Sequence, residues 1–472
     1  MFKNKKIVRL YAFPWIFLVL CICGIHYFLK RYFPEVTIHQ IIFFLNSPMT
    51  GVDTQIAHKF LTKCIFMPAL ASLIICYLPE IRKMCTPIFK FLGKYPYTKT
   101  MSLISISLIS LCLAHTLCQK RVWNFFFAKY SDFYEKNFVT PTPDNISFTH
   151  KKNLIILHVE SLEKTFENKE FFGSSMLPHL EKLERQGIQF SNYQNGFATD
   201  YTQGSLIALF SGLPSTHIPS NMTNVFGKNM KILPNYYSLG KILADNGYET
   251  YSLQGTKSDF AGQKPFLQTH GISHIEDFDT IKQNYPSYEI TGAWGYGDNE
   301  VLSVLKDKIT KIDHKKPYFI YVATIDTHAH YLPDAHEPSK FSNKYKNIIY
   351  NTNIKIAEFI NWFKTQPDYK NTVIVIIGDH LRMGDNFKMP RKRAIYNLFL
   401  NAPRPETTNR YFTQIDLFPS ILEAIGGKIP NHHLGLGVSV FSKEKTLAEC
   451  YTTKELEEHL EKKNKLYESL WQ

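Results

Sequence analysis

Three runs of apolar residues, each about the length of one β-strand, constrain the fold of this chain more than any other feature. They are NLIILHV at 153–159, PYFIYVATI at 317–325 and TVIVIIG at 372–378. Nearly continuous apolar runs of this length are typical of strands that are buried on both faces, as in a parallel sheet covered by helices. Helical patterns lie between them, at 177–187, 237–247 and 353–366. The alternation predicts an α/β domain over 151–472, with a mostly parallel sheet flanked by helices.

Acidic and imidazole side chains follow each of the three runs. They are Glu160 after the first run, Asp326, His328 and His330 after the second, and Asp379 and His380 after the third. In open α/β sheets, binding sites form beyond the carboxyl ends of the strands. One such ending would be an ordinary capped turn, but three at one edge predict a functional site there.

The residue types at this edge suit one divalent cation. Glu160 and Asp379 offer oxygen ligands, and His380 offers a nitrogen. Carboxylate and imidazole together fit Mn²⁺ or Zn²⁺, whereas the histidine makes Mg²⁺ a weaker candidate. No Cys-x-x-Cys pair is present in the sequence, so a thiolate zinc site is not expected.

A fourth ligand is predicted at Thr202, in the stretch TDYTQGSLIALFSGLPS at 199–215. This stretch has the start and stop signals of a short helix. A hydroxyl bound to a cation loses its proton more easily and becomes a nucleophile, and a helix N-terminus favours a phosphate. We therefore predict that Thr202 attacks phosphorus and carries a phospho-threonine intermediate. Thr199 is the alternative hydroxyl, and either threonine could instead be a simple helix cap.

The N-terminal part predicts a membrane domain over residues 1–120. Three apolar segments are long enough to span a bilayer, at 10–29, 60–78 and 101–118, although the second could also be a buried helix of a soluble protein. Basic residues precede the first segment and lie between the second and third, which predicts that both stretches are cytoplasmic. Residues 121–150 are then an interfacial linker, and residues 151–472 lie outside the cytoplasm.

The charge of the chain agrees with a membrane location. The formal net charge is +13, which favours contact with anionic material such as phospholipid headgroups. No basic motif interleaved with aromatic residues and no zinc-finger spacing is present in the sequence, so nucleic acid is not an expected partner.

Four motifs resemble the alkaline phosphatase and sulfatase superfamily, in the branch that contains lipoteichoic acid synthase and phosphoglycerol transferase I. They are HVESLE, YTQGSLIALFSGLP, TIDTHAH and GDHLRM, at 158–163, 201–214, 324–330 and 378–383. The resemblance implies that Glu160, Thr202, Asp379 and His380 bind the metal, which is typically manganese, and that Thr202 is the nucleophile. It also implies substrate contacts by His328, Trp294 and Lys264. Gly378 departs from the glucan-modifying enzymes, which usually have Ser there.

The resemblance implies a phosphoglycerol transferase anchored in the bacterial inner membrane, with its catalytic domain on the periplasmic or extracellular side. Its donor would be phosphatidylglycerol or a related phospholipid, and its acceptor a glycan or polymer.

Three alternatives remain. A two-metal phosphodiesterase or phosphatase could use Asp326 and His330 for a second cation. A phosphoethanolamine transferase of this superfamily usually has several disulfides outside the membrane. Cys450 is the only cysteine after residue 118, so this alternative is disfavoured. A third alternative is a scaffold without activity, but such a protein has no reason to retain all four ligands.

Glu163 lies three residues after Glu160, and we expect it to be exposed to solvent and not to belong to the site.

Overall fold

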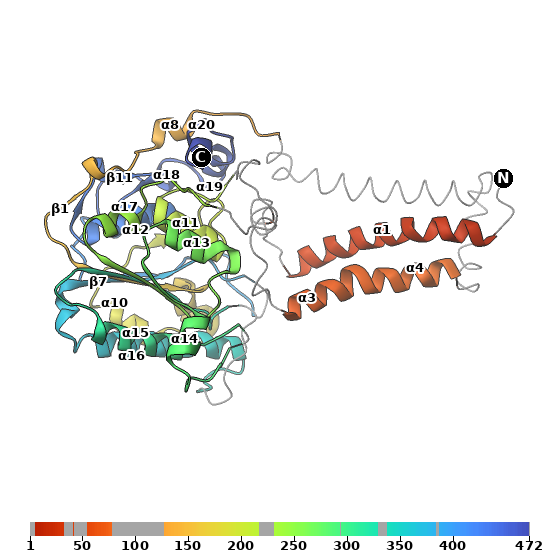
Figure 1. Ribbon diagram of the computed structural model, residues 1–472, viewed down its shortest axis with the longest axis horizontal. Coiled ribbons are helices and arrows are strands. Elements are labelled where there is room, and N and C mark those ends of the chain that lie inside the picture. The colour runs from red at the N-terminus through yellow and green to blue at the C-terminus, as the bar shows by residue number, and fades with distance from the viewer. Residues whose placement is uncertain are drawn as a thin grey trace. The chain divides into compact units, whose positions relative to one another are not determined.

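The computed structural model describes residues 5–32, 41, 54–77, 127–216, 231–292, 294–328, 338–383 and 387–471. They belong to two compact units, a helical unit near the N-terminus and an α/β unit formed mainly by the residues from 128 onward (Figure 1).

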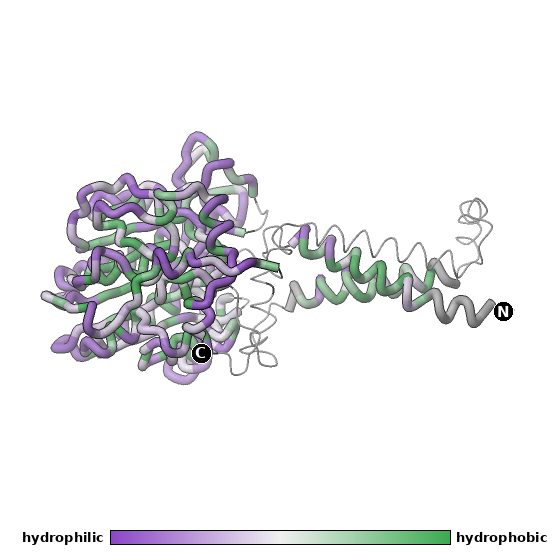
Figure 2. The backbone as a smooth tube through the Cα atoms, turned by 90° about the horizontal axis from the view of Figure 1, so that it is seen from above, coloured by the Kyte–Doolittle hydropathy of each residue, from purple (hydrophilic) through white to green (hydrophobic). Residues whose placement is uncertain are grey.

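The helical unit contains α1 (Lys5–Tyr32), α3 (Thr54–Leu61) and α4 (Met67–Tyr77), the last two joined by a π-helical turn (Thr62–Phe66). A Cβ atom on Gly24 would lie 2.8 Å from the carbonyl oxygen of Lys63, so glycine permits the close approach of α1 to this turn. Two stretches, Phe13–Tyr32 and Ala57–Ile74, are long and apolar enough to cross a membrane (Figure 2). They overlap two of the predicted spans. The span predicted at 101–118 lies outside the described residues.

The α/β unit is built on a six-stranded sheet in the order β5-β4-β6-β2-β7-β8. Its strands are β2 (Asn153–Val159), β4 (Glu249–Gln254), β5 (His274–Glu276), β6 (Tyr318–Ala323), β7 (Thr372–Gly378) and β8 (Asn397–Leu400). All neighbouring pairs are parallel except β7 and β8. The predicted mostly parallel sheet is therefore confirmed, and the three apolar runs form its central strands.

Helices cover both faces of this sheet because its strands are apolar on both sides. In β2, Leu154 and Ile156 pack into one core, whereas Ile155 and Leu157 pack into the other. The first core is covered by α11 (Thr202–Ser211), α12 (Leu239–Asp245), α13 (Gln263–Thr269) and α17 (Leu417–Ala424). The second core is covered by α10 (Pro178–Glu184), α14 (Phe278–Asn284), α15 (Asp298–Lys311) and α16 (Lys344–Phe363). Figure 1 shows these two layers.

Shorter elements complete the unit. They are α8 (Phe133–Asn137), α9 (Lys169–Phe172), α18 (Leu447–Cys450), α19 (Thr453–Leu460), α20 (Lys465–Ser469), and the strand pairs β1 (Ser147–Phe148) with β10 (Gly427–Lys428), β3 (Asn192–Tyr193) with β9 (Tyr411–Phe412), and β11 (His433–Leu434) with β12 (Gly437–Val438).

The register of the three central strands brings their carboxyl ends level. His158 in β2 lies opposite Ala323 in β6 and Ile377 in β7, and Val159 lies opposite Gly378. A Cβ atom on Gly378 would lie 2.0 Å from the carbonyl oxygen of Leu162, so this backbone leaves no room for serine at that position. The residues that follow the three strands therefore meet at one edge of the sheet.

Candidate active site at the carboxyl edge of the sheet

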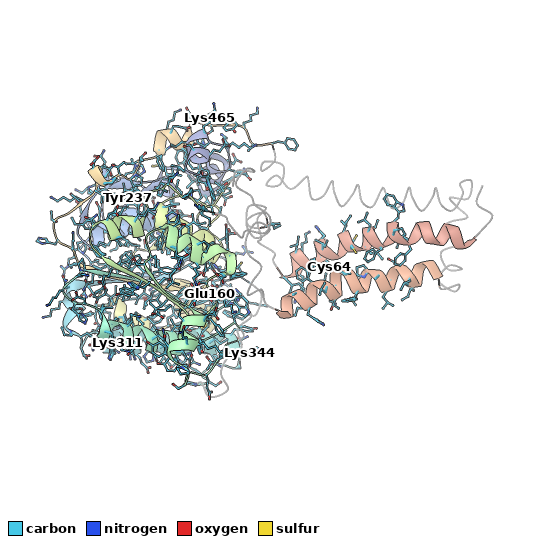
Figure 3. The ribbon with its side chains drawn as sticks, viewed as in Figure 1. Cys64, Glu160, Tyr237, Lys311, Lys344 and Lys465 are labelled. Carbon is cyan, nitrogen blue, oxygen red and sulfur yellow. The ribbon has the colours of Figure 1, made fainter. Side chains whose placement is uncertain are left out.

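Glu160, Asp379 and His380 form a buried cluster at this edge. Glu160 follows β2 directly, and the other two follow β7. Each side chain offers one ligand atom, and these atoms lie within 4.8 Å of one another. His380 Nε2 is 3.3 Å from Asp379 Oδ2 and 3.7 Å from Glu160 Oε1. The structure thus brings together three of the predicted metal ligands, of which Figure 3 labels Glu160.

Thr202 reaches the same cluster from the first residue of α11. Its Oγ1 donates a hydrogen bond to Glu160 Oε2 at 3.1 Å. Gly204 allows this helix start, because a Cβ atom there would lie 2.5 Å from the carbonyl oxygen of Ala198. The alternative hydroxyl, Thr199 Oγ1, instead donates to Gln414 Oε1 at 2.7 Å. Neither threonine is the helix cap, which is Tyr201.

The cluster fits a cation by its unused polar atoms. Asp379 Oδ2 and His380 Nε2 are buried and make no hydrogen bond. Burying such atoms without a partner is costly, so a bound cation would satisfy both. Two carboxylates, one imidazole and one hydroxyl supply oxygen and nitrogen donors of the kind that divalent transition metals accept.

The pKa values of the three clustered side chains show that it is unfavourable to bury two ionised carboxylates side by side. Burial, and then the carboxylate of Glu160, raises the pKa of Asp379 to about 7. Burial also pushes the pKa of Glu160 upward, but the charges of His328 and His380 and two hydrogen bonds outweigh it and lower that pKa. For His380, burial opposes the charged form, and the two carboxylates overcome it and raise the pKa. A divalent cation would hold both carboxylates in their ionised form.

Ser161 orders the two carboxylates, a role that the sequence analysis did not predict. Its N–H donates to Asp379 Oδ1 at 2.7 Å, and its Oγ donates to Glu160 Oε1 at 2.7 Å. The residue has a φ of +51°, a conformation that non-glycine residues seldom adopt. Such strain at a site residue is a sign of function, but only the backbone reveals it.

A second residue absent from the predictions, Gln414, joins two parts of the site. Its Nε2 donates to the carbonyl oxygen of Asp379 at 3.0 Å, and its Oε1 accepts from Thr199 Oγ1. It thereby links the loop before α11 to the loop after β7. No short-range pattern could show this, because Gln414 lies 35 residues after Asp379 and 215 after Thr199.

His328 and Trp294 lie together beside the cluster. The centroids of their rings are 4.2 Å apart. His328 is close enough to Glu160 to lower the pKa of that carboxyl. The turn that carries Trp294 is held against the end of β4 by a hydrogen bond from Tyr296 N to the carbonyl oxygen of Gly255, at 2.9 Å. These two predicted substrate contacts therefore share one position at the edge of the sheet.

The remaining predicted residues have other partners. Lys264 Nζ lies 3.6 Å from Asp277 Oδ2, beside the start of α14. Asp326 Oδ2 forms an ion pair with Lys355 Nζ at 2.7 Å, and Asp326 Oδ1 accepts from the backbone N–H of Asp298. His330, its partner in the two-metal alternative, lies outside the described residues.

The prediction that Glu163 is exposed to solvent is wrong. It is fully buried, and both of its carboxylate oxygens accept hydrogen bonds from the guanidinium of Arg393. One of them also accepts from the backbone N–H of Arg382 at 2.9 Å. The ion pair joins two residues that are 230 positions apart, so the burial of Glu163 could not be predicted from its sequence neighbours.

Comparison with known proteins agrees with this architecture. Residues 152–427 match the model of the sulfatase family. The chain is 30% identical over 331 residues to phosphoglycerol transferase I from Escherichia coli, an alignment that covers 63% of this chain and 41% of that protein. The chain thus spans about two fifths of the length of the curated relatives that it matches.

Two solved structures share the fold at low sequence identity. A protein of the alkaline phosphatase superfamily from Vibrio parahaemolyticus matches with a TM-score of 0.50 and 22% identity, over 61% of this chain and 72% of that one. The lipoteichoic acid synthase LtaP from Listeria monocytogenes matches with a TM-score of 0.51 and 14% identity, over 66% of this chain and 80% of that one.

Proposed function

The chain belongs to the sulfatase family, and from this premise we propose that it is a metal-dependent phosphoglycerol transferase. It moves glycerol phosphate from phosphatidylglycerol, or a related phospholipid, to a glycan or polymer acceptor. The name of the Escherichia coli relative supports this reaction class. The observation that carries the proposal is the hydroxyl of Thr202, which is bonded to Glu160 within a buried cluster of metal-ligand type.

The first step forms a covalent intermediate on Thr202. Its Oγ attacks the phosphorus of the donor lipid, so that the Oγ–P bond forms while the bond from phosphorus to the diacylglycerol oxygen breaks. Thr202 loses its proton, and the departing diacylglycerol oxygen gains one. The position of Thr202 at the first residue of α11 supports this role, because the N–H groups of a helix start favour the phosphoryl charge.

The second step returns the enzyme to its starting state. An acceptor hydroxyl attacks the same phosphorus, the Oγ–P bond breaks, and Thr202 regains its proton as the acceptor loses one. His328, beside Glu160, holds the departing or incoming oxygen, and Trp294 packs against the His328 ring to fix its position. Lys264, on the α13 side of the same edge, is the third proposed substrate contact.

Glu160, Thr202, Asp379 and His380 are the proposed ligands of one divalent cation, with Mn²⁺ favoured over Zn²⁺ and Mg²⁺. A cation bound there would neutralise phosphoryl charge and favour the ionised form of the Thr202 hydroxyl. The buried atoms Asp379 Oδ2 and His380 Nε2, which make no hydrogen bond, support this assignment. The ion pair of Asp326 with Lys355 favours one cation over two, because it already occupies a carboxylate that a second cation would need.

A phospholipid donor requires the catalytic domain to work at a membrane surface. We propose that the N-terminal helices anchor the chain in the bacterial inner membrane as a multi-pass protein, with the catalytic domain on the periplasmic or extracellular side. The two apolar stretches, Phe13–Tyr32 and Ala57–Ile74, support an anchor. Tethering a catalytic domain to the membrane raises the local concentration of a lipid donor.

The intact mass of the purified full chain tests donor and nucleophile together. The chain is incubated with Mn²⁺ and phosphatidylglycerol, beside Thr202→Ala and the control Thr199→Ala. We expect an added glycerol phosphate on the wild type and on Thr199→Ala, and none on Thr202→Ala. An adduct on Thr202→Ala would refute the assignment of the nucleophile.

The same experiment separates the alternatives. Free glycerol phosphate released without an acceptor would indicate a phosphodiesterase, for which a count of two bound metal ions is the further test. An adduct formed from phosphatidylethanolamine but not from phosphatidylglycerol would indicate a phosphoethanolamine transferase. A chain that gives neither adduct nor product with either lipid would contradict the assignment to a transferase.

A further inference from the structure

Two basic segments lie next to one another close to the metal-ligand cluster. Residues 338–346 contain three lysines, residues 387–393 contain two lysines and two arginines, and neither segment contains an acidic residue. Lys346 Nζ lies 5.8 Å from the ring centroid of Phe387, which joins the segments directly. The guanidinium of Arg382 lies 4.6 Å from the Phe387 ring and 5.9 Å from the Tyr345 ring. We call these two segments the basic rim.

The rim belongs to the edge of the sheet that carries the proposed active site. Arg382 is two residues after His380, and its backbone N–H is bonded to Glu163, three residues after Glu160. Lys344 is the first residue of α16. Figure 3 shows Lys344 on the same side of the domain as Glu160, and Lys311, at the end of α15, on the opposite side.

Most of the rim cations have no carboxylate partner. Arg393 is paired with Glu163. Within the part of the chain that the structure describes, six others form no ion pair, namely Lys340, Lys344, Lys346, Lys388, Arg391 and Lys392. The excess of basic residues remains when the residues that precede each segment are included, since 329–346 and 381–393 together hold eight basic and three acidic residues, a net formal charge of +5. Some exposed lysines elsewhere in the domain, such as Lys136, Lys316 and Lys443, are paired with acids, which makes them suitable for comparison with the rim.

We propose that this basic rim docks against the anionic headgroups of the membrane and so turns the edge of the sheet that carries the proposed active site toward the bilayer. The inference rests on the proposed function only in that the donor is a membrane lipid. Cations close to an anionic lipid surface are attracted to it, and the attraction adds up over several residues within a Debye length.

The aromatic rings of the rim favour a lipid surface over a sugar polymer. Phe387 contacts the buried guanidinium of Arg382 and the ammonium of Lys346, and Tyr345 contacts Arg382 and Lys344. These rings are half-buried and each has a lysine near its face, so they do not offer an open face on which a sugar could stack. The groups that the rim presents outward are charges, which suit a layer of anionic headgroups.

A fluorescent label that senses the membrane tests this docking without any turnover. The full chain, in a Cys450→Ser background, is labelled with an impermeant fluorophore at Ser342→Cys, an exposed rim position. The matched control is labelled at Thr310→Cys, an exposed position at the C-terminal end of α15. It is next to Lys311, which lies on the side of the domain away from the rim (Figure 3). The chain without either new cysteine supplies the blank. Both labelled chains are reconstituted into phosphatidylcholine vesicles, with or without phosphatidylserine, that contain a lipid with a quencher on its headgroup.

We expect quenching at position 342 to increase severalfold when phosphatidylserine is present. At about 1 M salt, where the Debye length is about 3 Å, we expect it to fall back. Quenching at position 310 should stay constant. Replacing Lys340, Lys344, Lys388 and Lys392 by Gln should abolish the increase. Replacing the paired lysines Lys136, Lys311, Lys316 and Lys443 by Gln changes the net charge equally and should preserve it.

Two outcomes would overturn the proposal. The first is quenching at 342 that does not depend on phosphatidylserine. The second is a signal that responds to soluble polyphosphate but not to anionic vesicles, which would make the rim a site for a soluble polyanion. Because phosphatidylserine is not the proposed donor, docking can be observed even if the mass experiment finds no transferase, and the two failures remain distinct.

Discussion

Two buried acidic clusters lie at the same edge of the sheet, and they are neutralised in different ways. One contains Asp298 and Asp326, and a lysine from α16, Lys355, lies 2.7 Å from Asp326 Oδ2. The other contains Glu160 and Asp379. The basic side chain that contacts the second pair is His380, which is itself of metal-ligand type.

The difference teaches which acidic cluster is structural and which is prepared for a ligand. In the first cluster, Asp298 Oδ1 accepts from the backbone N–H groups of Ile325 and Asp326, and Asp326 has its lysine. Asp298 Oδ2 is also buried without a hydrogen bond, but burial and then the Asp326 carboxylate raise the pKa of Asp298 to about 8, so this carboxyl carries a proton near pH 7. The second leaves a carboxylate oxygen and an imidazole nitrogen buried without a hydrogen bond. Buried charge of this kind needs a counter-ion, which supports our proposal that a cation from outside the chain completes the second cluster.

Removing the lysine of the structural cluster should give the largest effect. Lys355→Met leaves the Asp326 carboxylate buried without its partner, which costs about 3–5 kcal/mol of unfolding free energy. Thermal unfolding of the purified full chain in detergent, followed by circular dichroism, should show a Tm several degrees lower. The double variant with Asp326→Asn should recover much of the loss, because it removes the unpaired charge as well.

A nearby lysine provides the control for that comparison. Lys364 directly follows α16 and bonds to Gln186, a neutral partner. Lys364→Met should therefore change the Tm only slightly. If it lowered the Tm as much as Lys355→Met, the loss would come from α16 in general and not from the Asp326 charge.

Removing a carboxylate from the second cluster should affect function and not the fold. Asp379→Asn keeps an oxygen that can accept from the N–H groups of Ser161 and His380, so the loop should remain in place. Since changes around a metal ligand already cost 10–100-fold, we expect metal affinity and transfer to fall at least about 100-fold. Isothermal titration with Mn²⁺ and a transfer assay measure the two losses. The Lys355→Met, Asp326→Asn double variant should still bind Mn²⁺, and equal loss in both variants would abolish the distinction between the clusters.

Added metal should stabilise the chain through the second cluster alone. A ligand that binds only the folded state stabilises it by about 1.4 kcal/mol when its free concentration is about tenfold above Kd. Mn²⁺ should therefore raise the Tm of the wild type, and a chelator should reverse the increase. Asp379→Asn should show no such response. An equal increase in Asp379→Asn would mean that the metal acts at another site.

The sequence predicted the strands better than the helices, for a physical reason. The apolar runs at 153–159 and 372–378 coincide with β2 and β7, because a strand buried on both faces is apolar along its whole length. The helix predicted at 353–366 is α16, which begins at Lys344. Its first turn is polar, and its start signal is Asn343, whose side chain accepts from the N–H groups of Tyr345 and Lys346.

The site was predictable to the extent that strand order determines it. Glu160, Asp379 and His380 follow neighbouring parallel strands, so their meeting requires only the sheet. Ser161 required the backbone conformation, and Gln414 required the packing of distant loops. Asp326 has the same kind of position as Glu160 and Asp379, and its sequence neighbours do not show that Lys355, 29 residues later, neutralises it. Chemistry at the end of a strand can be predicted, whereas the charge partner that decides its role depends on tertiary structure.

The smallest expected effect is the pH dependence of the structural cluster. Burial, and then the Asp326 carboxylate, raises the pKa of Asp298 to about 8, from about 3.9 in an unfolded chain. Between these values the folded state binds more protons than the unfolded state. The unfolding free energy therefore falls as pH rises through this window and levels off above about 8, with a fall of about 1 kcal/mol between about pH 7 and pH 8.

Asp298→Asn should reduce that fall, because the amide does not titrate, and Tm measured across the same pH range gives the comparison. The matched control is Asp307→Asn in the same helix. Hydrogen bonds from Lys311 and Tyr285 overcome burial and lower the pKa of Asp307, so its contribution is lost only as pH falls well below this range. If the two variants change the pH dependence equally, Asp298 is not the titrating group. If only Asp298→Asn changes the pH dependence, Asp298 is the titrating group. The Asp298–Asp326 cluster would then bind a proton, whereas we propose that the Glu160–Asp379 cluster binds a metal ion.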